Sequence, residues 1–384
     1  MSSIALVGGT LITPLETRFS NLSIVDGRIA TISDHAGEEV PAKRVLDVTG
    51  CYVTPGLVDI QLNGGPRCNF WGDPTAEDIF ALSDDLLKAG VTCILPTLIT
   101  ADLDHIRKNI QFLKSVGVGV LENVALAQTK ATKSAAQSKT QLASRPRVRM
   151  PGIHVEGPCL SPAKPGVHPP QFIQPLNLEI LRKIADDAVR LITIAPELDP
   201  SGVTIDFLRE HNIAVSLGHS NATLEEASRA FDRGIRLITH TFNAMAPIHQ
   251  RAAGAVVAAL LDERVSCSLI CDGKHVEPAL IKLVVKVKGA GKVILVTDAA
   301  QVGTSGGGLV GSSINLSEAV VNVVNWQAAK FAEAILMATW NPAAAIGIEK
   351  QVGHLETGKY GDLVVWDRQT LAIRHVIVGG EVVS

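Results

Sequence analysis

Two histidines are the first residues whose types and spacing suggest chemistry. His219 and His240 each close a short apolar run, and one helical pattern separates the two runs. A carboxylate, Glu156, closes an earlier apolar run. A carboxylate and two imidazoles with an open fourth position suit a catalytic Zn²⁺, which lowers the pKa of a bound water to about 7. The pattern predicts one divalent metal ion per chain, with Zn²⁺ the expected ion. The alternative is that the imidazoles only form hydrogen bonds at the starts of loops.

Two more polar residues have types that would complete a reaction centre. Asp298 follows the all-apolar run 293–297, where a carboxylate is costly unless it is used or paired. Beside an activated water it would take a proton and later return it to a leaving group. The alternative for Asp298 is a helix N-cap. His275 follows Asp272 in a polar loop and could donate to a developing oxyanion, although an ordinary loop histidine would look the same.

An anion site is predicted beyond His240. Asn243 and Ala244 follow this histidine, and Arg251 comes shortly after them in the same loop. Backbone amides and a forked guanidinium together bind phosphate or carboxylate groups. The alternative is that Arg251 forms a surface salt bridge.

These residues need a framework that brings strand ends together. Eight short apolar runs recur after residue 54, with helical patterns such as 78–89 and 224–233 between them. Eight alternating strands and helices predict an α/β fold, a TIM-like (β/α)8 barrel, whose strand ends share one mouth. A doubly wound open sheet is the alternative. The runs are 57–62, 92–96, 152–156, 191–197, 214–219, 237–243, 266–272 and 293–298.

Both ends of the chain have the alternating pattern of β-strands. Asp26 and Gly27 stand between two alternating runs, which predicts a hairpin, and the segment 347–384 alternates again. We expect residues 1–53 and 346–384 to form one small discontinuous β-sandwich domain. The barrel, residues 54–345, would be inserted in it.

The overall composition excludes several classes of protein. A net charge of −3 gives no field for binding nucleic acid or an anionic membrane. The six cysteines form no CxxC pair, which is typical of a reducing compartment. The N-terminus lacks a signal-peptide pattern, and no apolar stretch reaches the roughly 18 residues of a membrane helix. We expect a soluble cytoplasmic protein. The stretch 128–149 carries six basic residues and no acidic one, and we interpret it as a solvated helix face and linker.

Nine segments resemble the amidohydrolase superfamily and, within it, the family of N-acetylglucosamine-6-phosphate deacetylases. The resemblance covers nearly the whole chain. Its most specific parts are Gly-His-Ser-Asn-Ala-Thr at 218–223 and Phe-Asn-Ala-Met at 242–245. The other segments are 54–65, 95–100, 154–158, 272–275, 296–299, 340–343 and 358–363.

The resemblance implies a role for each candidate residue. Glu156, His219 and His240 would bind the metal, and Asp298 would be the general base and acid. His275 would polarise the acetyl carbonyl, and His168 would contact the sugar. The 6-phosphate would be held by Asn243, Ala244 and Arg251. Many members of the superfamily carry a His-x-His pair where this chain has Gln61 and Asn63. These amides are poor Zn²⁺ ligands but good hydrogen-bonding groups behind the ligands, so a single metal is expected. The family further suggests a homodimer.

The chain departs from the family pattern in two places. Arg251-Ala252-Ala253-Gly254 stands where the family usually has Arg-Glu-Pro-Gly, and the stretch 301–313 is short and rich in glycine. We expect a more open mouth that excludes water less well, so the substrate is less firmly predicted than the reaction.

Three hypotheses follow for the function. The first is hydrolysis of the acetamide of N-acetylglucosamine 6-phosphate in amino-sugar catabolism. The second is hydrolysis of another anionic N-acyl or cyclic-amide substrate at the same site. The third is a non-catalytic sugar-phosphate binder. The presence of Asp298 argues against the third, because a binder has no need of a carboxylate beside the metal.

Overall fold

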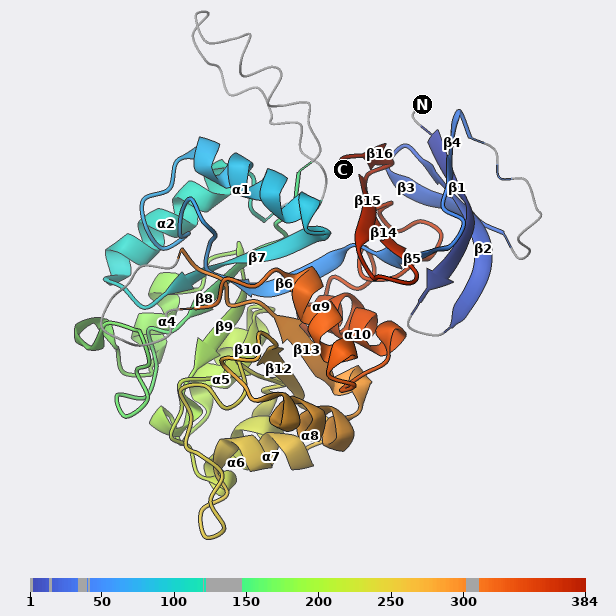
Figure 1. The fold of residues 1–384 in the computed structure, drawn as a ribbon. Helices are drawn as coiled ribbons and strands as arrows, with labels where there is room; N and C mark the ends of the chain where they lie inside the picture. The colour runs from blue at the N-terminus through green and yellow to red at the C-terminus, as the bar shows by residue number, and fades with distance from the viewer. Residues whose placement is uncertain are drawn as a thin grey trace, which may run out of the picture.

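The computed structural model describes residues 3–13, 16–33, 40, 42–119, 121, 147–301 and 311–384. Two eight-stranded sheets organise this part of the chain (Figure 1). Most of the basic stretch 128–149 and most of the glycine-rich stretch 301–313 lie outside the described residues, so the predictions made for them are not tested. No helix in the described ranges is long and apolar enough to cross a membrane.

The larger body is the predicted parallel barrel. Its strands follow one another in sequence order, each hydrogen-bonded in parallel to the next. The sequence predicted every one of them, and the open-sheet alternative is wrong because the first and last strands meet. The strands are β6 (Leu57–Leu62), β7 (Val91–Ile99), β8 (Ile153–Glu156), β9 (Val189–Ile194), β10 (Ala214–Leu217), β11 (Leu237–Ile238), β12 (Ser266–Ile270) and β13 (Val293–Val296).

The barrel closes just beyond the end of β13. The Asp298 amide donates to the Gln61 carbonyl at 2.9 Å, and the amides of Asn63 and Gly64 donate to the Ala299 carbonyl at 2.8 and 2.9 Å. A buried carboxylate, Asp59, supports this seam by accepting a 2.6 Å hydrogen bond from the Thr297 hydroxyl. The first strand and the segment carrying Asp298 are therefore fixed to each other.

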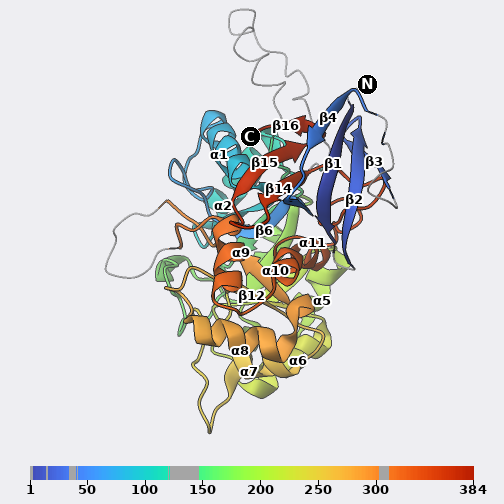
Figure 2. The ribbon, with the colours of Figure 1, turned by 45° about the vertical axis from the view of Figure 1, so that its right-hand side comes forward.

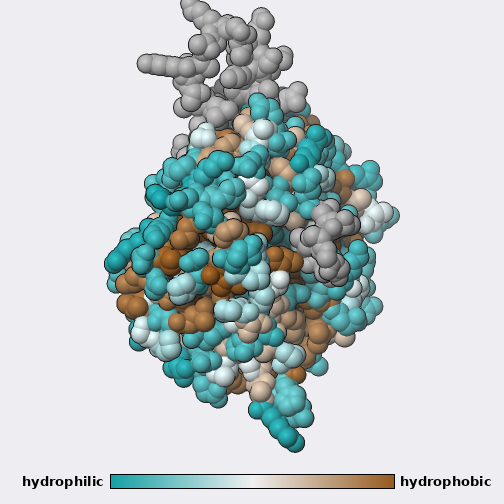
Figure 3. Space-filling view, turned by 90° about the vertical axis from the view of Figure 1, so that its left-hand side faces the viewer, coloured by the Kyte–Doolittle hydropathy of each residue, from teal (hydrophilic) through white to brown (hydrophobic). Residues whose placement is uncertain are grey.

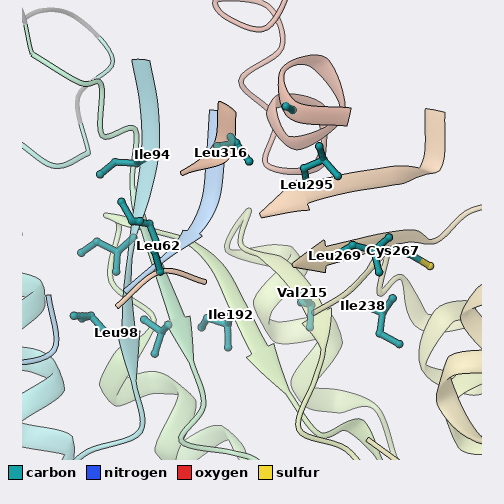
Figure 4. Close-up of a cluster of buried hydrophobic side chains, with 14 of the residues drawn as sticks. Leu62, Ile94, Leu98, Ile192, Val215, Ile238, Cys267, Leu269, Leu295 and Leu316 are labelled. Carbon is teal, nitrogen blue, oxygen red and sulfur yellow. The ribbon is translucent and has the colours of Figure 1, made fainter. Parts of the chain in front are cut away.

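Helices surround the barrel because its strands present apolar side chains on both faces. Ile94 and Leu98 of β7 point outward into the layer beneath the helices, as do Ile192, Val215 and Leu295 from other strands (Figure 4). The helices are α1 (Ala76–Lys88), α2 (Leu103–Ser115), α4 (Leu178–Ile184), α5 (Val203–Glu210), α6 (Leu224–Arg233), α7 (Gly254–Leu261) and α8 (Pro278–Lys288), followed by α9 (Leu316–Asn325), α10 (Phe331–Ala338) and α11 (Trp340–Ala345).

The inward side chains form a separate core. Cys93 and Leu95, which alternate with the outward residues of β7, pack with residues of other strands and with Ala343 and Ile346 at the end of α11. This apolar plug closes the end of the barrel opposite the mouth. The polar side chains at the strand ends therefore lie above a dry floor.

The second sheet combines both ends of the chain, as predicted (Figure 2). The Asp26-Gly27 hairpin joins two antiparallel strands, and both residues have positive φ, 47° and 82°. The last N-terminal strand, β5 (Cys51–Pro55), pairs with C-terminal β14 (Leu363–Asp367) and leads directly into β6 of the barrel. The strands are β1 (Ser3–Ile12), β2 (Thr17–Val25), β3 (Arg28–Ile32), β4 (Arg44–Asp47), β5 (Cys51–Pro55), β14 (Leu363–Asp367), β15 (Ile373–Val378) and β16 (Glu381–Val382).

A buried ion pair joins this domain to the barrel. Arg149, just before β8, contacts both carboxylate oxygens of Asp362, and both side chains are less than 5% exposed. The guanidinium also lies 3.6 Å from the centre of the Tyr360 ring. Because an unpaired charge at this depth is costly, the pair holds the two domains in one arrangement.

Candidate active site at the barrel mouth

A cavity of about 220 Å³ opens among the loops that follow the barrel strands. These loops lie on the left side of Figure 1, which faces the viewer in Figure 3, where hydrophobic residues gather near the centre of the face. The lining contains most of the residues predicted from the sequence. They are Asn63, Glu156, His168, His219, His240, Asn243, Ala244, His275 and Asp298.

The predicted metal ligands meet at one point. Glu156 Oε1 lies 2.9 Å from His240 Nε2 and 3.4 Å from His219 Nε2, and the two nitrogens are 3.1 Å apart. Ligand atoms held about 2.0–2.1 Å from a tetrahedral Zn²⁺ lie about 3.3 Å from one another. Burial alone would raise the pKa of Glu156, but hydrogen bonds and charge from the two histidines lower it well below its usual range. The geometry and the ionised carboxylate fit a divalent cation.

The hydrogen bonds of the histidines show which of them can bind a cation. His219 Nδ1 lies 3.1 Å from the Lys164 carbonyl, which can only accept, so its Nε2 carries the free lone pair. His168 also lies near Glu156 and His219, within 4.8 Å. Its Nδ1, however, accepts from the Thr100 amide, and burial lowers its pKa to about 3, so the single proton sits on Nε2. His168 therefore offers the cavity an N–H, which leaves His219 and His240 as the predicted imidazole ligands, although Glu156, His168 and His219 also lie close enough to one another to hold a metal ion.

Asp298 is held beside the ligands by two amides. Asn63 Nδ2 and Gln61 Nε2 donate to its Oδ1 at 2.6 and 3.1 Å, and Gln61 also donates to Glu156 Oε1 at 3.0 Å. Burial and the charge of Glu156 raise the pKa of Asp298 to about 7. The N-cap alternative for Asp298 is wrong, since the next helix in the described ranges, α9, is capped by Asn315.

His275 also lies in the cavity and is oriented by Asp272. The Asp272 carboxylate accepts from His275 Nδ1 at 2.7 Å and from the backbone amides of Lys274 and His275. Since Nδ1 carries a proton, Nε2 donates to a substrate only when the ring is an imidazolium.

The floor of the site is a layer of short hydrogen-bonded side chains. His154 Nε2 lies 2.8 Å from the Thr193 hydroxyl, which is 2.8 Å from the Thr239 hydroxyl, which in turn contacts Ser216. Burial lowers the pKa of His154 to about 4, so this layer is neutral. It separates the charged groups above it from the apolar plug below.

Two predicted site residues do not line the cavity: Gln61, which lies behind Glu156 and Asp298, and Arg251. Arg251 is exposed in the loop before α7, near Ile248, and Asn243 and Ala244 line the cavity without it. Several other lining residues were missed from the sequence: Trp71, Ile99, Gly166, Val167, Ile270, Lys274, Ala300 and Gly311. The place of Lys274 in the cavity could have been predicted, because Lys274 stands between Asp272 and His275 in a loop that already held a candidate residue.

Comparisons with known proteins agree with this geometry. The family model described as "Amidohydrolase family" matches residues 52–383. The chain is 30% identical to N-acetylglucosamine-6-phosphate deacetylase of Haemophilus influenzae over 98% of each chain. It is also 30% identical to N-acetylgalactosamine-6-phosphate deacetylase of Escherichia coli O157:H7, over 94% of each. An aspartate-to-alanine variant of the Mycobacterium smegmatis enzyme, solved in complex with N-acetyl-D-glucosamine-6-phosphate, superimposes with a TM-score of 0.82 at 28% identity over 100% of both chains. This protein therefore belongs to the amidohydrolase family and, within it, to the N-acetylglucosamine-6-phosphate deacetylases.

Proposed function

We propose that this protein hydrolyses the acetamide of N-acetylglucosamine 6-phosphate, giving acetate and glucosamine 6-phosphate in amino-sugar catabolism. The observation that carries the proposal is the Asp298 carboxyl, held by Asn63 and Gln61 directly beside the Glu156, His219 and His240 cluster. A binding protein would gain nothing from a half-buried carboxyl with a raised pKa at this point.

The residues of the cluster would hold one divalent metal ion per chain, and we propose Zn²⁺. When bound, such an ion supplies Lewis acidity and a water of lowered pKa. Gln61 and Asn63 act behind the ligands, since their amides are already used to hold Glu156 and Asp298. This arrangement favours one ion over two.

Asp298 would move the proton in both halves of the reaction. Its Oδ1 is occupied by two donors, whereas its Oδ2 forms no hydrogen bond within the described residues and is free to exchange a proton. Asp298 takes a proton from the attacking water, whose oxygen bonds to the acetamide carbon. The carbon–nitrogen bond then breaks, and the same proton goes to the departing amine. A pKa of about 7 suits a group that must act as base and then as acid.

Three groups would orient the substrate. His275, held by Asp272, would donate from Nε2 to the acetyl oxygen, and the His168 Nε2–H would donate to a sugar hydroxyl. Asn63 Oδ1 is buried and has no hydrogen-bond partner in the described residues, so it can accept from the substrate.

Asn243, Ala244 and Arg251 are proposed to bind the 6-phosphate. Because Arg251 lies outside the cavity of its own chain, it would reach the phosphate from a second copy. We therefore propose a homodimer. An exposed Ile248, 46% accessible, on the same loop is consistent with a contact surface there.

An acetate-release assay tests the function. We expect release from N-acetylglucosamine 6-phosphate to exceed release from N-acetylgalactosamine 6-phosphate and from both unphosphorylated sugars. A preference for N-acetylgalactosamine 6-phosphate would mean that the substrate assignment is wrong and that the proposed reaction, deacetylation, is right. Release from none of the four sugars would reject deacetylation of these hexosamines and leave another amide substrate or a binding role.

A further inference from the structure

Lys274 carries a positive charge in the cavity and has no role in the proposed reaction. Of the residues that line the cavity, it is the one lysine or arginine. Its side chain forms no ion pair with any carboxylate in the described parts of the chain, whereas Arg67, Lys114, Arg233 and Arg264 are each paired with an aspartate. A lysine in a cavity without a protein partner is available to an anionic ligand.

The backbone that carries Lys274 is fixed. Its amide donates to Asp272 Oδ1 at 2.8 Å, and Asp272 also holds the amide and the ring of His275. Gly273 has a φ of 72°, and a Cβ there would lie 3.2 Å from the Trp326 ring, so the turn suits only glycine. The backbone of Lys274 is therefore held in a defined position next to His275, the residue proposed to contact the acetyl oxygen.

The neighbouring loop carries the other proposed phosphate contacts. Strands β11 and β12 are adjacent in the barrel, so Asn243 and Ala244 after β11 lie beside the loop after β12 that holds Lys274. Glu156 is buried and Asp298 is half-buried, whereas Lys274 is exposed. The two carboxyl groups repel a phosphate, and the Lys274 ammonium attracts it. A dianionic substrate group is thus favoured at the Lys274 side.

We propose that Lys274 binds the anionic 6-substituent of the substrate and sets the preference for phosphorylated sugars within each chain. This inference rests on the proposed function for the identity of the sugar. It differs from the role given to Arg251, because Lys274 lines the cavity of its own chain and needs no partner subunit.

Steady-state kinetics on N-acetylglucosamine with and without the 6-phosphate test the assignment. Lys274→Met keeps the length of the side chain and removes its charge. We expect it to raise KM for the phosphorylated sugar roughly 10- to 100-fold, the range of a lost hydrogen bond to a charged group, and to leave kcat close to wild type. Lys274→Arg should restore most of the affinity. Lys282→Met removes the same charge from the exposed face of α8 and should change nothing.

Two results would overturn the role of Lys274. One is an unchanged KM for the phosphorylated sugar in Lys274→Met, and the other is an equal rise for the unphosphorylated sugar. If the wild-type metal-loaded protein releases acetate from neither sugar, the proposed function fails, and calorimetry with inorganic phosphate decides the inference separately. Phosphate that binds wild type and Lys282→Met but binds Lys274→Met much more weakly would support it. Equal binding to all three, or binding to none, would refute it.

Discussion

Replacing Asp298 with asparagine separates its chemical role from its structural role. Oδ1 accepts both protein hydrogen bonds, from Asn63 and from Gln61. In Asp298→Asn the amide oxygen takes the place of Oδ1, and the new NH₂ group points where Oδ2 was. The seam should survive as well, because it uses the backbone amide of residue 298. The variant should therefore fold and keep the metal ligands in place.

The size of the expected loss follows from proton transfer. A positioned general acid or base contributes roughly 10²- to 10⁴-fold, or about 3–5 kcal/mol of the barrier. An amide can do neither job, so kcat should fall by that factor while KM changes little. Stability should stay the same or rise, because burial and the charge of Glu156 raise the pKa of Asp298 and an amide does not carry that cost.

Asp59→Asn is the matched control for this experiment. Asp59 is a buried carboxyl on the same seam, bonded to Thr297 and not part of the cavity lining. We would measure acetate release, metal content and thermal unfolding for both variants. A kcat for Asp298→Asn within a few-fold of wild type, with metal content unchanged, would refute the acid–base role. An equal loss in both variants would show that the effect comes from the seam and not from proton transfer.

Four further outcomes are expected. Removing the metal with a chelator should abolish acetate release and lower Tm, because an ion at 1,000 times its Kd stabilises the fold by about 4 kcal/mol; full activity without metal would contradict the site. Arg251→Ala should raise KM roughly tenfold for phosphorylated sugars only, and equal effects on both sugars would remove Arg251 from the phosphate site. Asp362→Ala should cost about 3–5 kcal/mol, seen as a lower Tm, because Arg149 is left buried and unpaired; adding Arg149→Met should recover part of the loss. Burial raises the pKa of Asp59 to about 7 against hydrogen bonds from Thr297 and Gln61. The ionised form of Asp59 therefore destabilises the fold, so the gain in Tm on Asp59→Asn should be larger at pH 8 than at pH 5. The reverse order would show that the ionised carboxylate stabilises the fold.

The barrel was predictable because its signals are local. Each strand is a short apolar run, and six of the eight runs lead into the polar residues named above. Helices such as α6 begin at a capping box that the sequence displays, Thr223 with Glu226. Eight strand–helix units in succession predict a closed (β/α)8 barrel. The hairpin at Asp26-Gly27 was predictable for the same reason, since two residues define its turn.

The candidate-site residues that the chain's own pattern predicted stand mostly at strand ends, whereas His168, in a long loop, came only from the family resemblance. Glu156, His219, His240 and Asp298 all stand at strand ends. Trp71 and Val167 do not, because they reach the cavity from within long loops whose paths depend on contacts distant in sequence. For the same reason, it was not predictable that Arg251 does not line the cavity of its own chain. Its loop follows the residues that line the cavity, but nothing local in the sequence shows that the loop turns outward.

The backbone at the strand ends explains how one barrel edge can gather so many functional groups. His219, His240 and Asp298 all have left-handed backbone angles, with φ of 48°, 29° and 50°. Such angles cost a non-glycine residue of order 1–3 kcal/mol each and persist only where the surroundings hold them. A different hydrogen bond maintains each of these three strained backbone conformations. The His219 ring donates to the Lys164 carbonyl, the His240 amide donates to Ser268 Oγ at 2.7 Å, and the Asp298 amide donates across the seam.

These contacts come from elements far apart in the chain, so the site forms only when the barrel does. The Asp298 amide reaches Gln61 across 237 positions of sequence, and the side chain of Gln61 returns to hold Glu156 and Asp298 together. Closure of the barrel and assembly of the reaction centre are thus one event. This coupling explains why the strained residues are the ones proposed to carry the chemistry. With a relaxed backbone at the same positions, the side chains of His219, His240 and Asp298 would not be held toward one another.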